Sequence, residues 1–180
     1  MDIQKLCVDL GATKVEEIPV SKLVLQPELR QYCELNHCGL YNQNHTCPPL
    51  VGEIGSLITK LRGFNYAVFF QNVYPLEDSF DFEGMMAAKK NHQDMTKKIA
   101  SAVYAKFGRS DSLVLSAGGC AECRPCAAKT SKSCYYPDSA LVSLEAYGVN
   151  VSQIGEISGL SYINGINTVT YFSGVFVSCR

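Results

Sequence analysis

Residues 112–137 read SLVLSAGGCAECRPCAAKTSKSCYYP, a short apolar run that leads at once into a dense group of cysteines. The apolar residues 112–117 predict a strand, and Gly118-Gly119 connects that strand to the first thiol. The four thiols of the run are Cys120, Cys123, Cys126 and Cys134. A triplet with two residues between successive cysteines can present its thiolates to the corners of one iron–sulfur cube. The stretch therefore predicts a metal site at the end of a strand.

Disulfides are the main alternative explanation for a chain that contains 9 cysteines, an odd number. Residues 1–10, MDIQKLCVDL, include acidic side chains and no long apolar core, so they do not resemble a secretory signal. We therefore expect a cytoplasmic protein in a reducing compartment, where clustered cysteines hold metal more often than they form disulfides.

The spacing also bears on the identity of the metal. Zinc sites usually draw on two well-separated pairs of cysteines, whereas this loop offers a triplet followed by one further cysteine. That arrangement favours a 4Fe–4S cluster, with zinc as the alternative.

A second group of thiols lies in residues 33–49, which end in Cys47-Pro48-Pro49. Its members are Cys33, Cys38 and Cys47. Three thiolates need a fourth ligand, and the candidates are Cys7, Cys179, His37, His45 or an external group. With a histidine this would be a Cys3His zinc site, and with a cysteine or an open iron it would be a second cluster. The remaining alternative is that these three cysteines are simply packed or redox-active thiols.

The two segments together resemble the predicted metal-binding protein family, a domain of unknown function (2284) found mostly in anaerobic prokaryotes. The resemblance covers residues 29–177 and depends on a segment ending in Cys-Pro-Pro followed by a Gly-x-Cys-x-x-Cys-x-x-Cys pattern. Its residues are Cys33, Cys38, Tyr41, Cys47, Pro48, Pro49, Gly119, Cys120, Cys123, Cys126, Cys134, Pro137, Ser143, Glu145, Ala146 and Gly148. It implies a metal or iron–sulfur protein and brings no established reaction.

One position departs from the family pattern. Where relatives typically read Glu-Ala-Cys-Gly, this chain reads Glu145-Ala146-Tyr147-Gly148. If that cysteine is the fourth ligand of the Cys33, Cys38 and Cys47 site, Tyr147 removes it and leaves an open or substituted site.

The composition indicates a single globular domain over residues 1–180, with 47% hydrophobic residues and no low-complexity run. The net charge of −1 gives no basic footprint for nucleic acid, and we expect no membrane-spanning segment. The sequence leaves the oligomeric state open.

Periodicity predicts helices over residues 53–61 and 84–107 and strands over 65–74, 112–117 and 167–178. A further helix is expected to begin at Pro137, with Asp138 as its N-cap. The buried stripe of the long helix includes His92, which is expected to be a core residue rather than a ligand. These elements predict an α+β (or α/β) fold with a small mixed sheet covered by helices and two cysteine-rich loops.

Three functions are compatible with these features. The first is an electron-transfer protein whose cluster passes single electrons to a redox partner protein. The second is a scaffold in which zinc only orders the loops. The third is an enzyme that uses an open iron site, for which Glu145 offers an acidic side chain.

Overall fold

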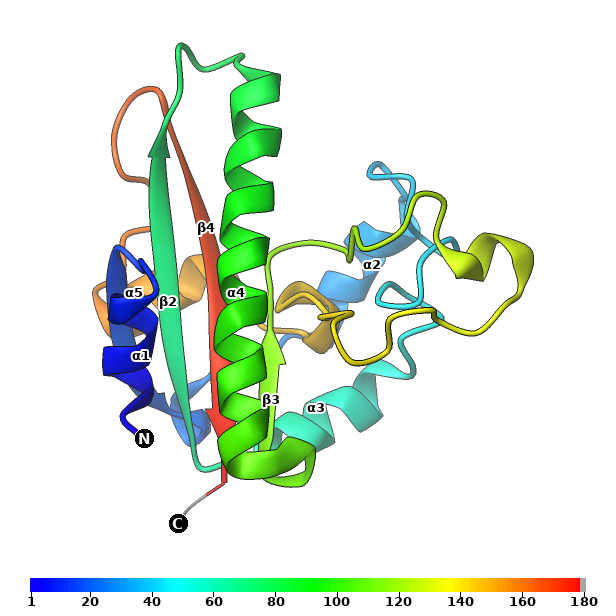
Figure 1. The fold of residues 1–180 in the computed structure, drawn as a ribbon, viewed down its shortest axis with the longest axis horizontal. Helices are drawn as coiled ribbons and strands as arrows, with labels where there is room; N and C mark the ends of the chain where they lie inside the picture. The colour runs from blue at the N-terminus through cyan, green and yellow to red at the C-terminus, as the bar shows by residue number, and fades with distance from the viewer. Residues whose placement is uncertain (179–180) are drawn as a thin grey trace.

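A four-stranded antiparallel sheet forms the centre of the protein in the computed structural model, which describes residues 1–178 (Figure 1). The strands are β1 (Lys14–Pro19), β2 (Tyr66–Pro75), β3 (Ser112–Leu115) and β4 (Thr168–Val177). Their order across the sheet is β1-β2-β4-β3. The central pair is aligned from Tyr66 opposite Val177 to Pro75 opposite Thr168, so β2 and β4 form the longest ladder.

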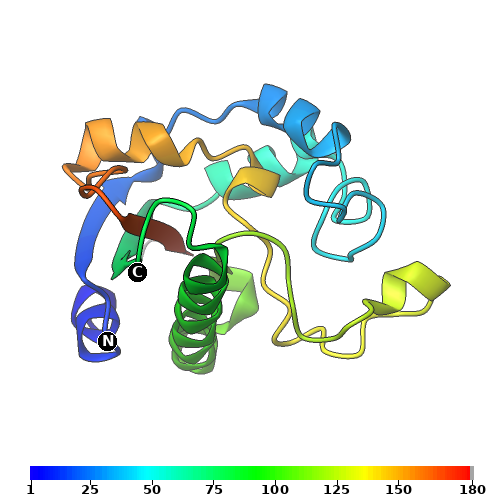
Figure 2. The ribbon, with the colours of Figure 1, turned by 90° about the horizontal axis from the view of Figure 1, so that it is seen from above.

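Helices cover both faces of this sheet (Figure 2). The α-helices are α1 (Ile3–Asp9), α2 (Arg30–Glu34), α3 (Ile54–Arg62), α4 (Phe82–Asp111) and α5 (Val151–Ser158). Residues of α1 and α4 pack on one face, whereas residues of α3 and α5 pack on the other. No helix among residues 1–178 is both long enough and apolar enough to cross a membrane.

The long helix α4 follows from the sequence as predicted. Asp81 caps its first turn by accepting a hydrogen bond from the Gly84 amide at 2.7 Å. Its buried stripe faces the sheet and includes Met95, Ile99 and Val103. Near the end of the helix, Gly108 has a φ of 77°, which interrupts the helical backbone before the chain enters β3.

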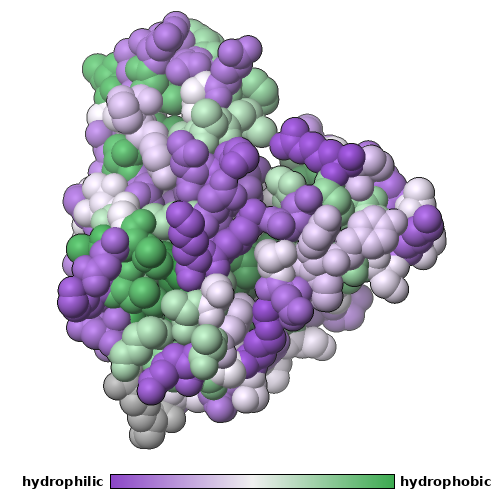
Figure 3. All heavy atoms as spheres, in the orientation of Figure 1, coloured by the Kyte–Doolittle hydropathy of each residue, from purple (hydrophilic) through white to green (hydrophobic). Residues whose placement is uncertain are grey.

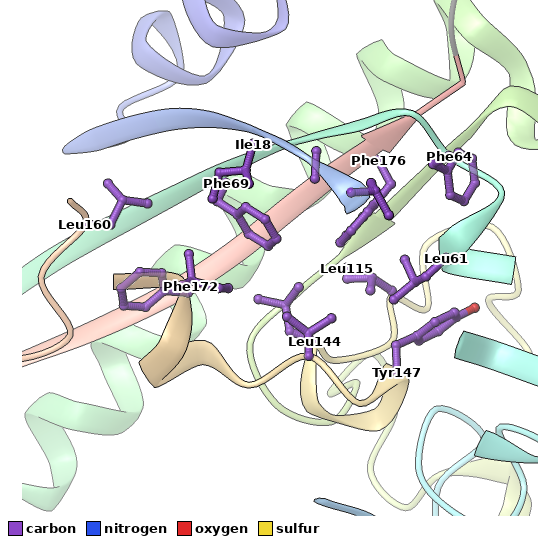
Figure 4. Packing of buried hydrophobic residues seen from close by; sticks show 14 residues of the cluster. Ile18, Leu61, Phe64, Phe69, Leu115, Leu144, Tyr147, Leu160, Phe172 and Phe176 are labelled. Atoms are coloured by element: carbon purple, nitrogen blue, oxygen red, sulfur yellow. The ribbon is translucent and has the colours of Figure 1, made fainter. Parts of the chain in front are cut away.

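The opposite face of the sheet is packed with aromatic side chains (Figure 4). The rings of Phe69 and Phe176 meet edge to face with centroids 5.6 Å apart. Leu61 of α3 and Ile154 of α5 complete this cluster from the helices that lie above it. Burial of these side chains fixes the edge of the sheet from which the cysteine loop departs.

The α+β class and the coverage of the sheet by helices are confirmed, but two details of the sequence prediction are wrong. The sheet is antiparallel rather than mixed, because β4 lies between β2 and β3 and runs opposite to both. No helix begins at Pro137. The chain turns at Tyr136, extends to a bridge between Ser116 and Ser143, and next becomes α-helical at Val151, after the N-cap Asn150.

His92 lies in the core, as predicted, and forms a buried polar network between α4 and the sheet. Its Nδ1 is 3.0 Å from Asn72 Oδ1, and its Nε2 is 2.8 Å from Ser173 Oγ. Burial lowers the pKa of this imidazole to about 4, against the opposing effect of a backbone hydrogen bond to Phe172. The ring is therefore neutral at pH 7, and its hydrogen bonds link α4 to the sheet.

Candidate metal centre

The two cysteine segments lie side by side next to β3, in a part of the molecule that we call the cysteine lobe, residues 30–50 and 118–140 (Figure 1). The Cys120 amide donates a hydrogen bond to Thr46 Oγ1 at 3.0 Å. Asn44 Nδ2 donates to the Cys120 carbonyl at 2.8 Å, and the side chains of Asn44 and Thr46 are buried. These bonds hold the first cysteine of one segment against the loop that carries Cys47.

His45 makes a second connection between the segments. Its Nε2 hydrogen-bonds to the Lys132 carbonyl at 2.8 Å, which assigns the ring proton to that nitrogen. Its backbone N–H donates to the sulfur of Cys126. This histidine was one candidate for a fourth metal ligand, and in the structure its Nε2 is already used to join the two segments.

Glycine at position 119 allows the strand end to approach the other segment closely. A Cβ on Gly119 would lie 2.7 Å from Leu40 Cδ1 and 3.1 Å from Cys47 Sγ. The preceding Gly118 has a φ of +68°, which turns the chain out of the sheet, and a Cβ there would lie 2.7 Å from Lys89 Nζ. The Gly-Gly pair thus permits the contact between the cysteine segments.

We call residues 118–140 the longer loop and residues 30–50 the shorter segment. The four thiols of the longer loop are free and partly buried. Cys120 interacts electrostatically with Cys123 and Cys134, and the Cys126 sulfur forms a hydrogen bond with the Cys123 thiol. Burial is the main reason that the pKa of Cys120 is raised. Burial also acts to raise the pKa of Cys126, but hydrogen bonds from Ala128 and His45 outweigh it and lower that pKa.

The thiols of the other segment are free as well, and Cys38 contributes to the raised pKa values of Cys33 and Cys47. Burial, with the neighbouring thiols, raises the pKa of Cys47 to about 11. Burial also raises the pKa of Cys33, while the charge of Arg30 opposes that effect. A bound cation reverses this tendency, because metal binding displaces the thiol proton.

Within residues 1–178, no three His, Cys, Asp or Glu side chains converge as a metal-binding group. Cys120 still interacts electrostatically with Cys123 and Cys134 of its own segment, and it also acts on Cys47 of the other segment. The donor set is nevertheless suited to a soft metal or an iron–sulfur cluster, since it consists of free thiols in irregular loops. Binding would then require these side chains to rotate toward a common centre, which couples metal binding to the order of the lobe.

The structure separates the candidates for the fourth ligand of the Cys33, Cys38 and Cys47 group. Cys7 belongs to α1 and is buried in the core on the sheet face that α4 also covers, and burial raises its pKa to about 12. His37 is exposed, and Cys179 lies outside the described residues. Cys7 is therefore excluded by its position.

Tyr147, at the position where the family resemblance led us to expect a cysteine, is also directed into the core. It ends the short 3-10 helix η4 (Glu145–Tyr147) and packs in the cluster with Leu61 and Leu144 (Figure 4). Tyr147 is therefore a packing residue in this chain.

Two cations in or beside the lobe were not anticipated from the sequence. Arg30, at the start of the shorter segment, donates to the carbonyls of Gly52 at 3.1 Å and Ala146 at 3.2 Å, so it links the lobe to the residues before α3 and to η4. Lys89 of α4 lies beside Gly118 and interacts with Glu145, an exposed residue that also interacts with Cys33. Both cations become recognisable only when the fold brings them beside the thiols.

A cavity of about 470 Å³ lies between α4 and residues 135–141, which directly follow Cys134 in the sequence. Tyr104, Tyr135 and Tyr136 contribute to its walls. Lys97 of α4, which also lines the cavity, forms an ion pair with Glu122 between Cys120 and Cys123. This pair connects the longer cysteine loop to the helix.

The fold and the lobe define an α+β protein in which two thiol-rich segments meet beside one sheet. The family model described as "Predicted metal-binding protein (DUF2284)" matches residues 16–177, so the chain belongs to this family of predicted metal-binding proteins. The matched range contains both cysteine segments and nearly the whole sheet. Comparisons with curated proteins and with solved structures give no match.

Proposed function

We propose that the cysteine lobe binds a 4Fe–4S cluster through Cys120, Cys123, Cys126 and Cys134, and that the protein passes single electrons to a partner protein. The observation that carries this proposal is the set of four free, partly buried thiols in one loop that emerges from the end of β3. Membership of a predicted metal-binding family supports it. When bound, such a cluster supplies one-electron redox chemistry.

The surrounding residues would tune such a site through charge and hydrogen bonding. The Glu122 amide lies 3.5 Å from Cys120 Sγ, and the His45 amide donates to the sulfur of Cys126. Donors to thiolate sulfur favour the more negatively charged state of a cluster. The half-buried Arg30 adds positive charge near Cys33.

The second segment supports a further centre in the same proposal. Cys33, Cys38 and Cys47 supply three thiols, and the burial of Cys7 in the core supports a fourth ligand other than this cysteine. A cluster held by this segment would keep one position for a ligand from outside the set of three cysteines. The expected content is therefore one cluster in the longer loop, with a second where the shorter segment is also filled.

An enzymatic role is the second candidate, favoured by the exposed Glu145 and the neighbouring Lys89 beside the three-thiol segment. An open iron next to these groups would bind an added ligand. Cyanide titration followed by electron paramagnetic resonance tests this role: a changed signal favours it, and an unchanged signal opposes it.

The primary test is the content of iron, zinc and acid-labile sulfide in protein purified without oxygen. We expect about four iron and four sulfide per chain for one cluster, or about eight of each for two. Cys123→Ser should abolish the cluster of the longer loop, whereas Cys7→Ala, which alters a cysteine outside the lobe, should leave the iron content unchanged. Zinc without sulfide would contradict the proposal and indicate a structural zinc protein.

A further inference from the structure

Two neighbouring loops at one end of the sheet expose large hydrophobic side chains, and we call this surface the apolar tip. One loop, residues 76–82, connects β2 to α4 and includes the first residue of that helix; it exposes Phe80 by 92% and Phe82 by 71%. The other, residues 159–167, leads into β4 and exposes Ile163 by 80% and Ile166 by 90%. Exposed side chains of this size, gathered at one place, are typical of an interaction surface.

The loops are held together by specific hydrogen bonds. Leu76 N donates to the Asn167 carbonyl at 2.8 Å, and Ser79 Oγ donates to Asn167 Oδ1 at 3.1 Å. Figure 1 shows both loops at the ends of β2 and β4, away from the cysteine lobe.

The loop that carries the two phenylalanines is also ordered internally. The Phe80 amide donates to Asp78 Oδ1 at 2.7 Å, and Asp81 accepts hydrogen bonds from both Glu77 N and Gly84 N. These bonds hold the backbone that carries Phe80 and Phe82, which lowers the entropic cost of ordering the loop on binding.

The charge at the apolar tip is strongly one-sided. Glu77, Asp78, Asp81 and Glu83 give four negative charges, and residues 64–88 and 159–170 contain no lysine or arginine. The tip therefore carries −4, compared with −1 for the whole chain. Hydrophobic and hydrophilic surfaces lie side by side at this end of the molecule (Figure 3).

The negative charge of the apolar tip favours some binding partners over others. Symmetric pairing of two tips would bring eight carboxylates together, and an anionic membrane would repel them. We propose that the apolar tip docks onto an apolar face of a partner protein, such as one side of an amphipathic helix, that is bordered by lysine or arginine. Phe80 and Phe82 would pack on that apolar face, while the carboxylates pair with the basic residues at its border.

The test uses two labelled amphipathic helical peptides as probes, one of leucine and lysine and the other of leucine and glutamate. Fluorescence anisotropy should show binding of the lysine peptide to the wild-type protein and at least tenfold weaker binding of the glutamate peptide. Phe80→Ser/Phe82→Ser should weaken binding of the lysine peptide at least tenfold.

Glu77→Gln/Glu83→Gln should weaken binding of the lysine peptide and reduce its salt dependence. Val24→Ser is the matched control, since Val24 is exposed in another part of the chain. It should leave the affinity unchanged. Thermal unfolding of each variant should match the wild type, because the substituted side chains are exposed.

Several results would overturn the proposal. They are no binding of the lysine peptide, equal binding of both peptides, or an affinity that the phenylalanine substitutions do not change. Binding to phosphatidylcholine vesicles that depends on Phe80 and Phe82 would assign the tip to membranes instead. A concentration-dependent dimer that these substitutions dissociate, seen by sedimentation, would assign the tip to a second copy of the chain.

Discussion

The sheet with its helices and the cysteine lobe are stabilised in different ways. The sheet buries two hydrophobic clusters, one on each face, which include Phe69 and Phe176 on one side and Phe70 on the other. In the lobe, by contrast, the buried residues are Asn44, Thr46, Pro48 and Ala127. The lobe thus depends on hydrogen bonds between polar groups rather than on a hydrophobic core. A bound metal adds most to the stability of such a region.

Loss of core packing should have the largest effect on stability. Phe176→Ala should reduce the free energy of unfolding by about 3 to 5 kcal/mol, because it removes a fully buried ring that packs on Phe69. Urea denaturation monitored by circular dichroism measures the change. The control is Tyr32→Ala, an exposed aromatic of the lobe, which should change the value by less than about 0.5 kcal/mol. Equal losses in the two variants would contradict the contrast between the two regions.

Acidification should destabilise the sheet through His92. Its pKa is lowered from 6.5 to about 4 by folding, so the unfolded state binds the proton more readily than the native state between these values. The contribution of neutral His92 to the free energy of unfolding is therefore fully present above pH 6.5 and is lost as the pH falls toward 4. For a shift of this size the loss is on the order of 3 kcal/mol.

Unfolding measured from pH 4 to pH 7 should show a smaller pH dependence in His92→Gln than in the wild type. His37→Gln, which alters an exposed histidine, should keep the wild-type dependence. An identical profile in all three proteins would show that His92 is not the group responsible.

Disruption of the polar tie between the cysteine segments should have a smaller and more local effect. Asn44→Ala removes the bond to the Cys120 carbonyl and leaves the amide and hydroxyl of Thr46 without their acceptor, at a cost of about 1 to 3 kcal/mol. Hydrogen exchange should become faster in residues 42–50 and 118–126 and remain unchanged in β2. Asn91→Ala, on the exposed side of α4, is the control. Faster exchange in β2 would contradict a local effect.

Removal of a surface ion pair of α4 should have the smallest effect on the free energy of unfolding. Lys90 and Asp94 form a bond of 2.6 Å with largely exposed side chains, so Lys90→Gln should cost less than about 0.5 kcal/mol. Thermal unfolding at low and high salt measures this difference, which should disappear at high salt. A larger loss that persists in salt would indicate an additional role for Lys90.

The elements with strong hydrophobic periodicity were predictable from the sequence. The helix predicted over residues 84–107 corresponds to α4, and the strand predicted over 65–74 corresponds to β2. In both, burial and local preference agree. By contrast, β1 was missed because its residues, KVEEIP, are mostly exposed at the edge of the sheet.

The prediction of a helix that begins at Pro137 was wrong for a different reason. Its capping signal is local, but the pairing of Ser116 with Ser143 draws the chain into an extended path. In the lobe, sequence spacing identified the thiols, while the ties through Asn44 and Arg30 depend on contacts between distant segments. Those contacts leave no periodic signal in the sequence.

Hydrogen exchange of wild-type protein and Cys123→Ser, both purified without oxygen, tests most directly whether bound metal orders the cysteine lobe. We predict faster exchange throughout residues 30–50 and 118–140 in the variant, together with loss of iron and unchanged protection in β2 and β4. Equal protection of the lobe in the two proteins, or an equal loss in the sheet, would contradict the account.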